Sequence, residues 1–158
     1  MTVVGVNDEP EGIDGIIATH EDQPLTFNTT DFGFTDVDND DLLSVIIDTP
    51  PQTGRLELSG TPVASGDVVP AALLTNLVYT PPLNSNLNIQ DTIKFRVQDN
   101  GGSDFNGTDT DSTGNTLKIN VLPVNDAPYS ADKIINVVED SVYTFNACLL
   151  YTSDAADE

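Results

Sequence analysis

The chain has 158 residues, which is enough for one domain with a proper core, or for one domain and part of another. Its 26 acidic and 5 basic residues give a net charge of −21, which argues against nucleic acid and anionic membrane surfaces as partners, because both require lysine- and arginine-rich patches. No apolar run approaches the ~20 residues of a membrane span, and a single cysteine, Cys148, excludes a disulfide framework.

The first segment, residues 1–10, contains a motif that recurs later in the chain. Val6-Asn7-Asp8-Glu9-Pro10 returns as Val124-Asn125-Asp126-Ala127-Pro128, at an offset of 118 residues. Residues 6–28 and 124–146 are identical at 12 of 23 positions, which indicates a tandem repeat. We therefore expect residues 1–10 to be the end of a preceding repeat and a linker. The proline of each motif stiffens the linker and keeps the residue before it extended.

Residues 11–123 are predicted to form one complete unit. Apolar alternation, β-branched residues and intervening turn residues predict strands near residues 12–19, 24–29, 42–48, 54–59, 73–80, 91–98 and 115–122. No segment shows the sustained apolar period of a long helix. These features favour an all-β fold, a seven-stranded antiparallel Greek-key β-sandwich of cadherin or immunoglobulin type.

The core of this sandwich is expected to come from the apolar residues of the strands. The predicted core residues are Ile16, Phe27, Phe32, Phe34, Leu43, Val45, Ile47, Leu56, Leu58, Leu77, Val78, Tyr79, Ile93, Phe95, Val97, Leu117, Ile119 and Val121. We expect the aromatic residues among them to pack in the core rather than to bind a ligand.

The chain continues into a second copy that is cut short. Residues 124–147 correspond to the linker and the first two strands of a truncated next repeat. Residues 148–158, CLLYTSDAADE, resemble the translation of a sequencing-library adaptor and depart from the repeat, so we exclude them from the fold prediction.

Acidic residues gather in a turn-prone stretch, Asp36-Val37-Asp38-Asn39-Asp40-Asp41. Hard cations such as calcium take six to eight oxygen ligands, mostly from carboxylates and carbonyls on backbone that converges. The stretch is not an EF-hand, because Asp41 stands where that loop needs glycine and Ile47 where it needs glutamate. Aspartate also favours turns without binding an ion, so Asp40 and Asp41 remain evenly balanced between the two roles.

Strand direction predicts which acids come together. If each strand reverses the direction of the one before it, Asn7, Asp8, Asp36, Asp38 and Asp99 meet at one end of the sandwich. Glu21, Asp22, Asp91, Asn125 and Asp126 meet at the other end. Carboxylates that cluster in this way repel one another unless a cation bridges them, and ordinary turn, cap or surface roles are the alternative.

These residues carry a family resemblance that covers about residues 1–147. The Val-Asn-Asp-x-Pro linkers, Glu21-Asp22, the Asp36-x-Asp38 loop and Val97-Gln98-Asp99-Asn100-Gly101 resemble the cadherin-like repeats of large bacterial surface and secreted adhesins. Gly54-Arg55-Leu56-Glu57-Leu58 is similar to the middle of chondroitin sulphate proteoglycan repeats. The linker is shorter than in animal cadherins, and Asp91 lacks that family's full Leu-Asp-Arg-Glu sequence.

The resemblance implies calcium bound between successive domains, by the ten residues assigned above to the two ends. It also implies an extracellular location, secreted or at the cell surface. The expected partners are neighbouring repeats joined through calcium, with cell-surface or matrix ligands bound by other domains. The expected function is a non-catalytic module that extends and rigidifies an adhesin in cell adhesion or in a biofilm matrix.

We do not expect an enzyme. The sole histidine, His20, has no Gly-x-Ser-x-Gly elbow to serve, and the acids lie at the ends of the sandwich instead of in a sugar-binding cleft. Two alternatives remain open: an accessory spacer or carbohydrate-binding module of a secreted polysaccharide-degrading enzyme, and a domain that binds a ligand or a copy of itself directly.

Overall fold

The computed structural model describes residues 5–83, 89–125, 132 and 134–144. The predicted ligand Asp126 and the adaptor-like residues 148–158 lie outside these ranges. The described part is mostly strand, so the prediction of an all-β fold is confirmed.

Eleven strands and three short 3-10 helices make up the described part of the chain. The strands are β1 (Glu11–Ile13), β2 (Gly15–His20), β3 (Leu25–Thr26), β4 (Gly33–Thr35), β5 (Leu42–Thr49), β6 (Arg55–Leu58), β7 (Thr61–Pro62), β8 (Asp67–Pro70), β9 (Leu77–Thr80), β10 (Ile89–Asp99) and β11 (Asn115–Leu122). The helices are η1 (Thr29–Asp31), η2 (Ala71–Asn76) and η3 (Asp104–Asn106). Each of the seven predicted segments contains at least one of these strands.

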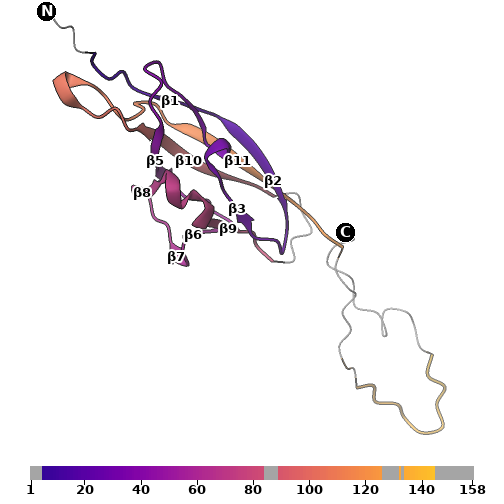
Figure 1. The fold of residues 1–158 in the computed structure, drawn as a ribbon. Helices are drawn as coiled ribbons and strands as arrows, with labels where there is room; N and C mark the ends of the chain where they lie inside the picture. Colours follow the sequence, from indigo (N-terminus) through magenta and orange to yellow (C-terminus); the bar gives the residue numbers. More distant parts are fainter. Residues whose placement is uncertain (1–4, 84–88, 126–131, 133, 145–158) are drawn as a thin grey trace, which may run out of the picture.

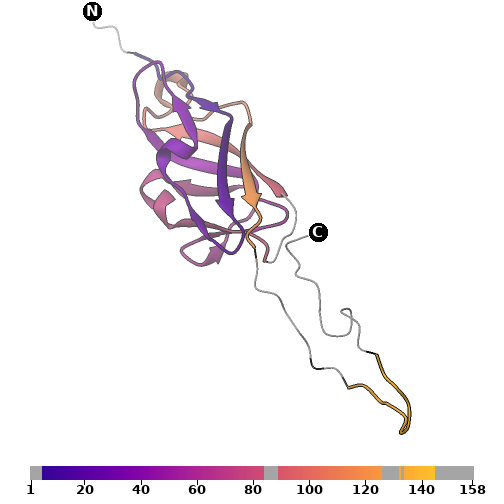
Figure 2. The ribbon, with the colours of Figure 1, turned by 90° about the vertical axis from the view of Figure 1, so that its right-hand side faces the viewer.

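Two sheets pack against each other in a sandwich-like arrangement (Figures 1 and 2). One has five strands in the order β2-β11-β10-β5-β8, and the other has four in the order β3-β9-β6-β7. Strands β1 and β4 pair separately as a two-stranded ladder. Along β10 and β11, buried residues alternate with exposed or half-buried residues. This is the period expected of strands that have one face in a core.

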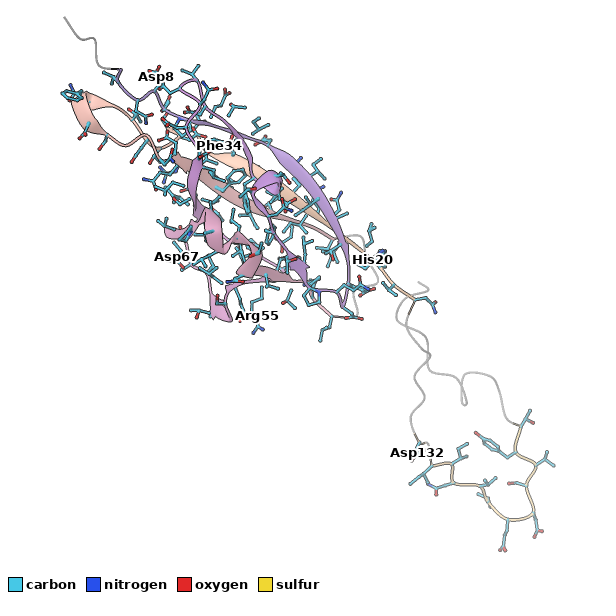
Figure 3. The ribbon with its side chains drawn as sticks, in the orientation of Figure 1. Asp8, His20, Phe34, Arg55, Asp67 and Asp132 are labelled. Carbon is cyan, nitrogen blue, oxygen red and sulfur yellow. The ribbon has the colours of Figure 1, made fainter. Side chains whose placement is uncertain are left out.

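One pairing departs from the antiparallel prediction. Strand β2 runs parallel to β11, with Leu117 opposite Gly15 and Leu122 opposite His20, whereas the other ladders of the described residues are antiparallel. Both strands run from the end where the chain enters the sandwich to the end where it leaves. Asp8 and His20 therefore lie at opposite ends of the sandwich (Figure 3).

The core lies between the two larger sheets. Its fifteen buried apolar residues run from Phe27 to Val121, so a single unit supplies them all. At its centre Phe32 stacks edge-on against Phe95, with ring centroids 5.1 Å apart, and lies 5.5 Å from the ring of Phe27. Aromatic pairs of this geometry add to the stabilisation from burial.

Three predicted core residues are wrong. Val78 is half-buried and lies outside the core, because its neighbours Leu77 and Tyr79 occupy the inner face of β9. Ile16 is 67% exposed, because β2 places Ile17 on the inner face and its neighbour must then point outward. Leu43 is 49% exposed. A register shift lies beside it, where Asp99 pairs with Leu42 and Gln98 with Ser44, and this irregularity interrupts the inward alternation.

The structure also contains elements that the sequence pattern did not indicate. Val69 is fully buried in β8, a segment in which the apolar alternation is too short to predict a strand. Leu74 is fully buried in η2, a helix that replaces the start of the predicted strand 73–80. The predicted strand 12–19 is divided at Asp14, whose Oδ1 accepts a 2.7 Å hydrogen bond from the Thr116 amide. Strand β1 then pairs with β4, and β2 with β11.

Candidate metal centre

An acidic loop lies between β4 and β5, at the end of the sandwich where β5 begins and β10 ends; we name this end the N-terminal pole. One carboxylate oxygen from each of Asp36, Asp38 and Asp40 lies within 4.8 Å of the others. The Asp40 amide donates a 2.9 Å hydrogen bond to Asp36 Oδ1, and Asn39 has a positive φ of 65°. This tight loop brings alternate carboxylates together.

Asp99, the last residue of β10, adds a fourth carboxylate to the same pole. It continues the inward alternation of Phe95 and Val97 and has no exposed surface. Its Oδ1 accepts hydrogen bonds from Asn7 Nδ2 at 3.0 Å and from the Gly101 amide at 2.8 Å. The strand period therefore determines that this acid faces the interior.

The linker before β1 is bound to this pole at two residues. Asn7 Nδ2 also donates to the Thr108 carbonyl at 2.8 Å, and the Thr108 amide donates to the Asn7 carbonyl at 3.0 Å. The Asp8 amide donates to Asp38 Oδ2 at 2.8 Å. The backbone of Asp8, more directly than its exposed side chain, connects it to the acidic loop.

Two oxygens at the centre of the pole are shielded from solvent and have no hydrogen-bond donor among the described residues: Asn7 Oδ1 and Asp36 Oδ2. The Asn7 amide is not free to turn, since its nitrogen is held by Asp99 and Thr108. Its oxygen must therefore face the carboxylates. A buried acceptor without a donor costs about 1–3 kcal/mol, so an arrangement of this kind requires an explanation.

Glycine at position 101 leaves room for these oxygens. A Cβ on Gly101 would lie 2.0 Å from Asn7 Oδ1 and 2.3 Å from Asp40 Oδ2. The linker amide and the acidic loop thus direct oxygens at the same point beside the backbone of residue 101. The sequence motif Asp99-Asn100-Gly101 predicted an acid here but did not reveal this second role of the glycine.

Loss of solvation and repulsion among the carboxylates raise the pKa of Asp40 above its ordinary value. Loss of solvation raises it first, followed by the negative charges of Asp36 and Asp99 and then those of Asp38 and Asp41. A group of acids in this state binds either a proton or a cation. The atoms of these residues that could ligate a metal ion are oxygens, which calcium and other hard cations prefer.

The opposite end of the sandwich, where β2 and β11 end, is named the C-terminal pole, and its acids have different surroundings. Asp91 is buried, and its carboxylate accepts hydrogen bonds from the amides of Gln52, Thr53 and Gly54 and from the hydroxyls of Thr53 and Tyr79. Burial alone would raise the pKa of Asp91, but these donors outweigh burial and lower it. Asp91 thereby ties the loop before β6 to β10.

Glu21 and Asp22 follow β2 at this pole. Glu21 is buried, and its Oε1 accepts a 2.7 Å hydrogen bond from the Val124 amide. Asp22 is exposed in a turn with a φ of 61°. Asn125 is exposed in the linker, next to the undescribed Asp126. Within the described residues, no three acids of the C-terminal pole come close enough to share an ion.

The predicted ligands therefore separate into two groups. The structure brings Asn7, Asp36, Asp38 and Asp99 together and adds Asp40, whose position two residues after Asp38 was the available signal. It does not assemble Glu21, Asp22 and Asp91 into such a group, because two of these side chains are bound by backbone amides. Among the described residues, a cluster of three acids close enough to share an ion is found at the N-terminal pole. The prediction for the C-terminal pole includes Asp126, which lies outside the described residues, and stays a prediction.

A further buried acid was missed by the sequence analysis. Asp111 accepts hydrogen bonds from the Gly12 amide at 2.9 Å, from Asn115 Nδ2 at 2.7 Å and from the Thr113 amide at 2.7 Å. Burial would raise its pKa, and the donors from Thr113, Gly12 and Asn115 lower it below the ordinary value. Its spacing before Ser112-Thr113 is typical of a turn, and the contact with Gly12 joins β1 to the start of β11.

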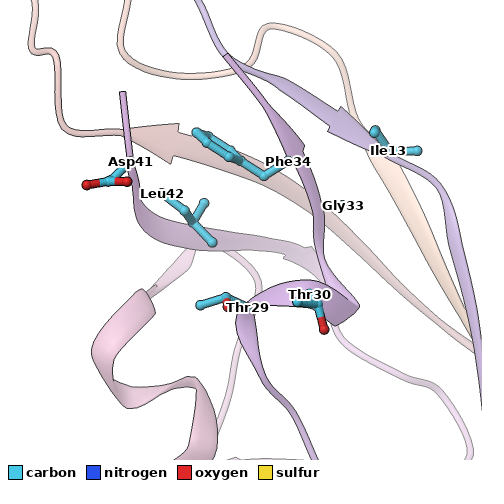
Figure 4. Close-up of a pocket in the computed structure, with 7 residues that line it drawn as sticks. All are labelled: Ile13, Thr29, Thr30, Gly33, Phe34, Asp41 and Leu42. Atoms are coloured by element: carbon cyan, nitrogen blue, oxygen red, sulfur yellow. The ribbon is translucent and has the colours of Figure 1, made fainter. Parts of the chain in front are cut away.

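A surface hollow lies beside β1 and β4 (Figure 4). Its lining consists of Ile13, Thr29, Thr30, Gly33, Phe34, Asp41 and Leu42. One acid, two hydroxyls and apolar side chains offer no paired acid and base for catalysis.

The chain matched no protein-family model, no curated protein and no solved structure. Among the described residues, no helix has both the length and the apolar character needed to cross a membrane. The function proposed for this protein therefore depends on the geometry of its own residues.

Proposed function

We propose that residues 11–123 form a non-catalytic, calcium-binding repeat that extends and rigidifies a large extracellular adhesin. The observation that carries this proposal is the pair of buried oxygens without donors, Asn7 Oδ1 and Asp36 Oδ2, among the carboxylates of the N-terminal pole. A bound cation would take the place of the hydrogen-bond donor that both oxygens lack. It also offsets the loss of solvation and the repulsion that together raise the pKa of Asp40.

The residues that would hold the ion are Asn7, Asp36, Asp38 and Asp40, with Asp99 beside them. Oxygens on opposite sides of a calcium ion are about 5 Å apart, since each lies at about 2.4 Å from it. The three loop oxygens lie close enough together to share one ion. The absence of sulfur and imidazole from this group favours calcium over zinc or copper.

The finer description of the fold also belongs to this proposal. We assign the unit to the seven-stranded Greek-key class of cadherin- and immunoglobulin-like sandwiches, with β1 and β2 counted as one divided strand and with β4, β7 and β8 as additions. The parallel pairing of β2 with β11 and the entry and exit of the chain at opposite poles support this assignment. Units of this shape join end to end, which is suited to a linear array of repeats.

The array accounts for partners and location. Residues 1–10 are the end of a preceding repeat and a linker, and residues 124–147 are a linker and the first two strands of the next repeat. Neighbouring repeats are thus the expected partners. Cell-surface or matrix ligands are assigned to other domains of an extracellular, secreted or surface-attached protein. The strongly acidic surface keeps such a chain away from nucleic acid and anionic membranes.

The first test is thermal unfolding of the chain in chelator and in saturating calcium. If calcium binds only the folded state, a concentration ~100 times the dissociation constant stabilises it by about 2.7 kcal/mol. The melting temperature should then rise by roughly 10 °C. In Asp36→Asn this gain should shrink strongly, because the replacement removes a charged ligand at the pole.

Asp67→Asn is the matched control. Asp67 pairs with Ile47, at the far end of β5 from the acidic loop, and it is exposed. The same change of charge there should leave the calcium gain intact. Equal gains for both variants, or no gain for the parent chain, would contradict the proposal.

A further inference from the structure

Glu21 binds the part of the chain that leaves β11. The ladder between β2 and β11 ends with His20 opposite Leu122. Beyond it, the Glu21 amide donates to the Leu122 carbonyl at 2.9 Å, and the Val124 amide donates to Glu21 Oε1 at 2.7 Å. Backbone and side chain of one residue therefore hold the first part of the linker.

Glu21 is well placed for this contact. It is 1% exposed and belongs to a turn in which the Gln23 amide donates to the His20 carbonyl. Thr19 Oγ1 also donates to the Gln23 carbonyl, at 3.0 Å. A buried carboxylate in such a turn makes a strong, charge-assisted hydrogen bond with the linker amide.

The second copy of the turn shares one backbone feature with the first. Glu139 and Asp140 stand 118 residues after Glu21 and Asp22. Asp140 has a φ of 60°, and Asp22 has a φ of 61°. The second copy thus shares the backbone conformation of the aspartate, while its glutamate, Glu139, is exposed.

The other side of a junction is visible before β1. There Asn7 is bound by Asp99 and by the backbone of Thr108, all within the unit that follows the linker. The counterpart of Asn7 in the next linker is Asn125. In an array, Val124 is thus bound by the unit before it and Asn125 by the unit after it, and the two residues are consecutive.

We propose that Glu21 is a linker clamp that, together with the N-terminal pole of the next copy, leaves no freely rotating residue between adjacent repeats. Its partner is an adjoining copy of the same unit. The two poles then face each other directly, and the mutual orientation of neighbouring repeats is set before any cation binds. This inference rests on the tandem array of the proposed function, but not on calcium binding.

Amide hydrogen exchange of Val124, measured by NMR on the whole chain in chelator, tests the clamp. We expect Val124 to be protected in the parent chain. Protection should fall by roughly ten- to a hundredfold in Glu21→Ala, the range for a lost hydrogen bond to a charged acceptor. Glu21→Gln keeps an acceptor oxygen and should retain most of the protection, and core amides report that each variant is folded.

Asp22→Asn is the matched control, since it changes the neighbouring exposed charge and asparagine also tolerates a positive φ. It should leave Val124 protected. An unprotected Val124 amide in the parent chain, or equal protection in the parent and Glu21→Ala, would overturn the proposal.

Orientation is tested on a tandem protein in which residues 8–125 follow Asn125, because each unit contains its complete core between Phe27 and Val121. Residual dipolar couplings in chelator should show two units with one mutual orientation, and Glu21→Ala should let them reorient independently. Independent units in the parent tandem would overturn the clamp even if calcium binds. Two units of fixed mutual orientation whose melting temperature does not change with calcium would instead contradict the proposed function alone.

Discussion

Two aspartates on the inner face of β10 show how neighbouring donors decide what a carboxylate does. Asp91 and Asp99 are both buried, at opposite ends of the strand. Asp91 meets several N–H and O–H groups, so its charge is satisfied within the protein. Asp99 lies next to a loop in which Asp36 Oδ2 has no described donor. The first residue organises a loop, and the second helps to form a candidate cation site.

Asp40→Asn should have opposite effects with and without calcium. In chelator it should raise the melting temperature, because it removes a charge from a group of mutually repelling acids. In saturating calcium it should lower the melting temperature relative to the parent, because a ligand is lost. Asp104→Asn, an exposed change at the same pole, should do neither. A variant less stable than the parent in chelator would show that Asp40 stabilises the fold without an ion.

Strand β10 is the element that connects both poles. It pairs with β11 on one side and with β5 on the other, and its inward residues include both buried aspartates. The register shift opposite Leu42 lies at its N-terminal-pole end. At the other end the hydrogen bonds to Asp91 hold the loop of Gln52, Thr53 and Gly54. Tyr79 closes this site, and burial and then the charge of Asp91 raise its pKa.

The lowered pKa of Asp91 predicts how stability depends on pH. The folded protein binds this proton less tightly than the unfolded chain, so the contribution is full above the ordinary aspartate pKa near ~4 and is lost as pH falls through the lower folded value. Asp91→Asn should reduce the free energy of unfolding at pH 7 by about 3 kcal/mol, since its NH2 group would face the donors of Thr53 and Gly54.

The measurement is denaturant unfolding between pH 7 and pH 3. Part of the acid-induced loss of stability should disappear in Asp91→Asn, whereas Asp14→Asn, which keeps its acceptor oxygen for the Thr116 amide, should behave like the parent. Parallel curves for the parent and Asp91→Asn would contradict this role of Asp91.

At the scale of the whole molecule, charge imbalance opposes the fold. The chain has 26 acidic and 5 basic residues, and two ion pairs connect side chains of its described part, Arg96 with Asp48 and Arg55 with Glu57. Most acids therefore have no basic partner, and their mutual repulsion favours the expanded chain. Sodium chloride screens this repulsion without occupying a calcium site.

Raising sodium chloride from ~0.01 M to ~1 M shortens the screening length from about 30 Å to about 3 Å. In chelator the melting temperature should rise by several degrees, and the gain should be smaller once calcium is bound, because part of the repulsion is then already neutralised. If the melting temperature in chelator does not change with salt, repulsion between the surface acids does not contribute measurably to the stability of the fold.

Several features of the fold and of the candidate site could be predicted from the sequence alone, because the interactions that determine them are local. Alternation along the strands predicted the all-β class and most of the core. The recurrence of the Val-Asn-Asp-x-Pro motif predicts a tandem repeat, and this stays a prediction. The turn-prone Asp36-x-Asp38 stretch indicated the acidic loop, since a short loop necessarily brings alternate side chains close to one another. Strand direction then placed Asn7 and Asp99 at the same pole.

Only the tertiary structure decided the rest, because those outcomes depend on partners distant in the chain. The choice of Ile17 over Ile16 for the inner face follows from pairing with β11, and the exposure of Leu43 follows from an irregular register with β10. Asp91 and Asp99 both accept hydrogen bonds from backbone amides, but residues 52–54 surround Asp91 with donors, whereas Asp99 lies beside the acidic loop. A sequence records where carboxylates stand, whereas the donors that surround each of them are brought together by folding.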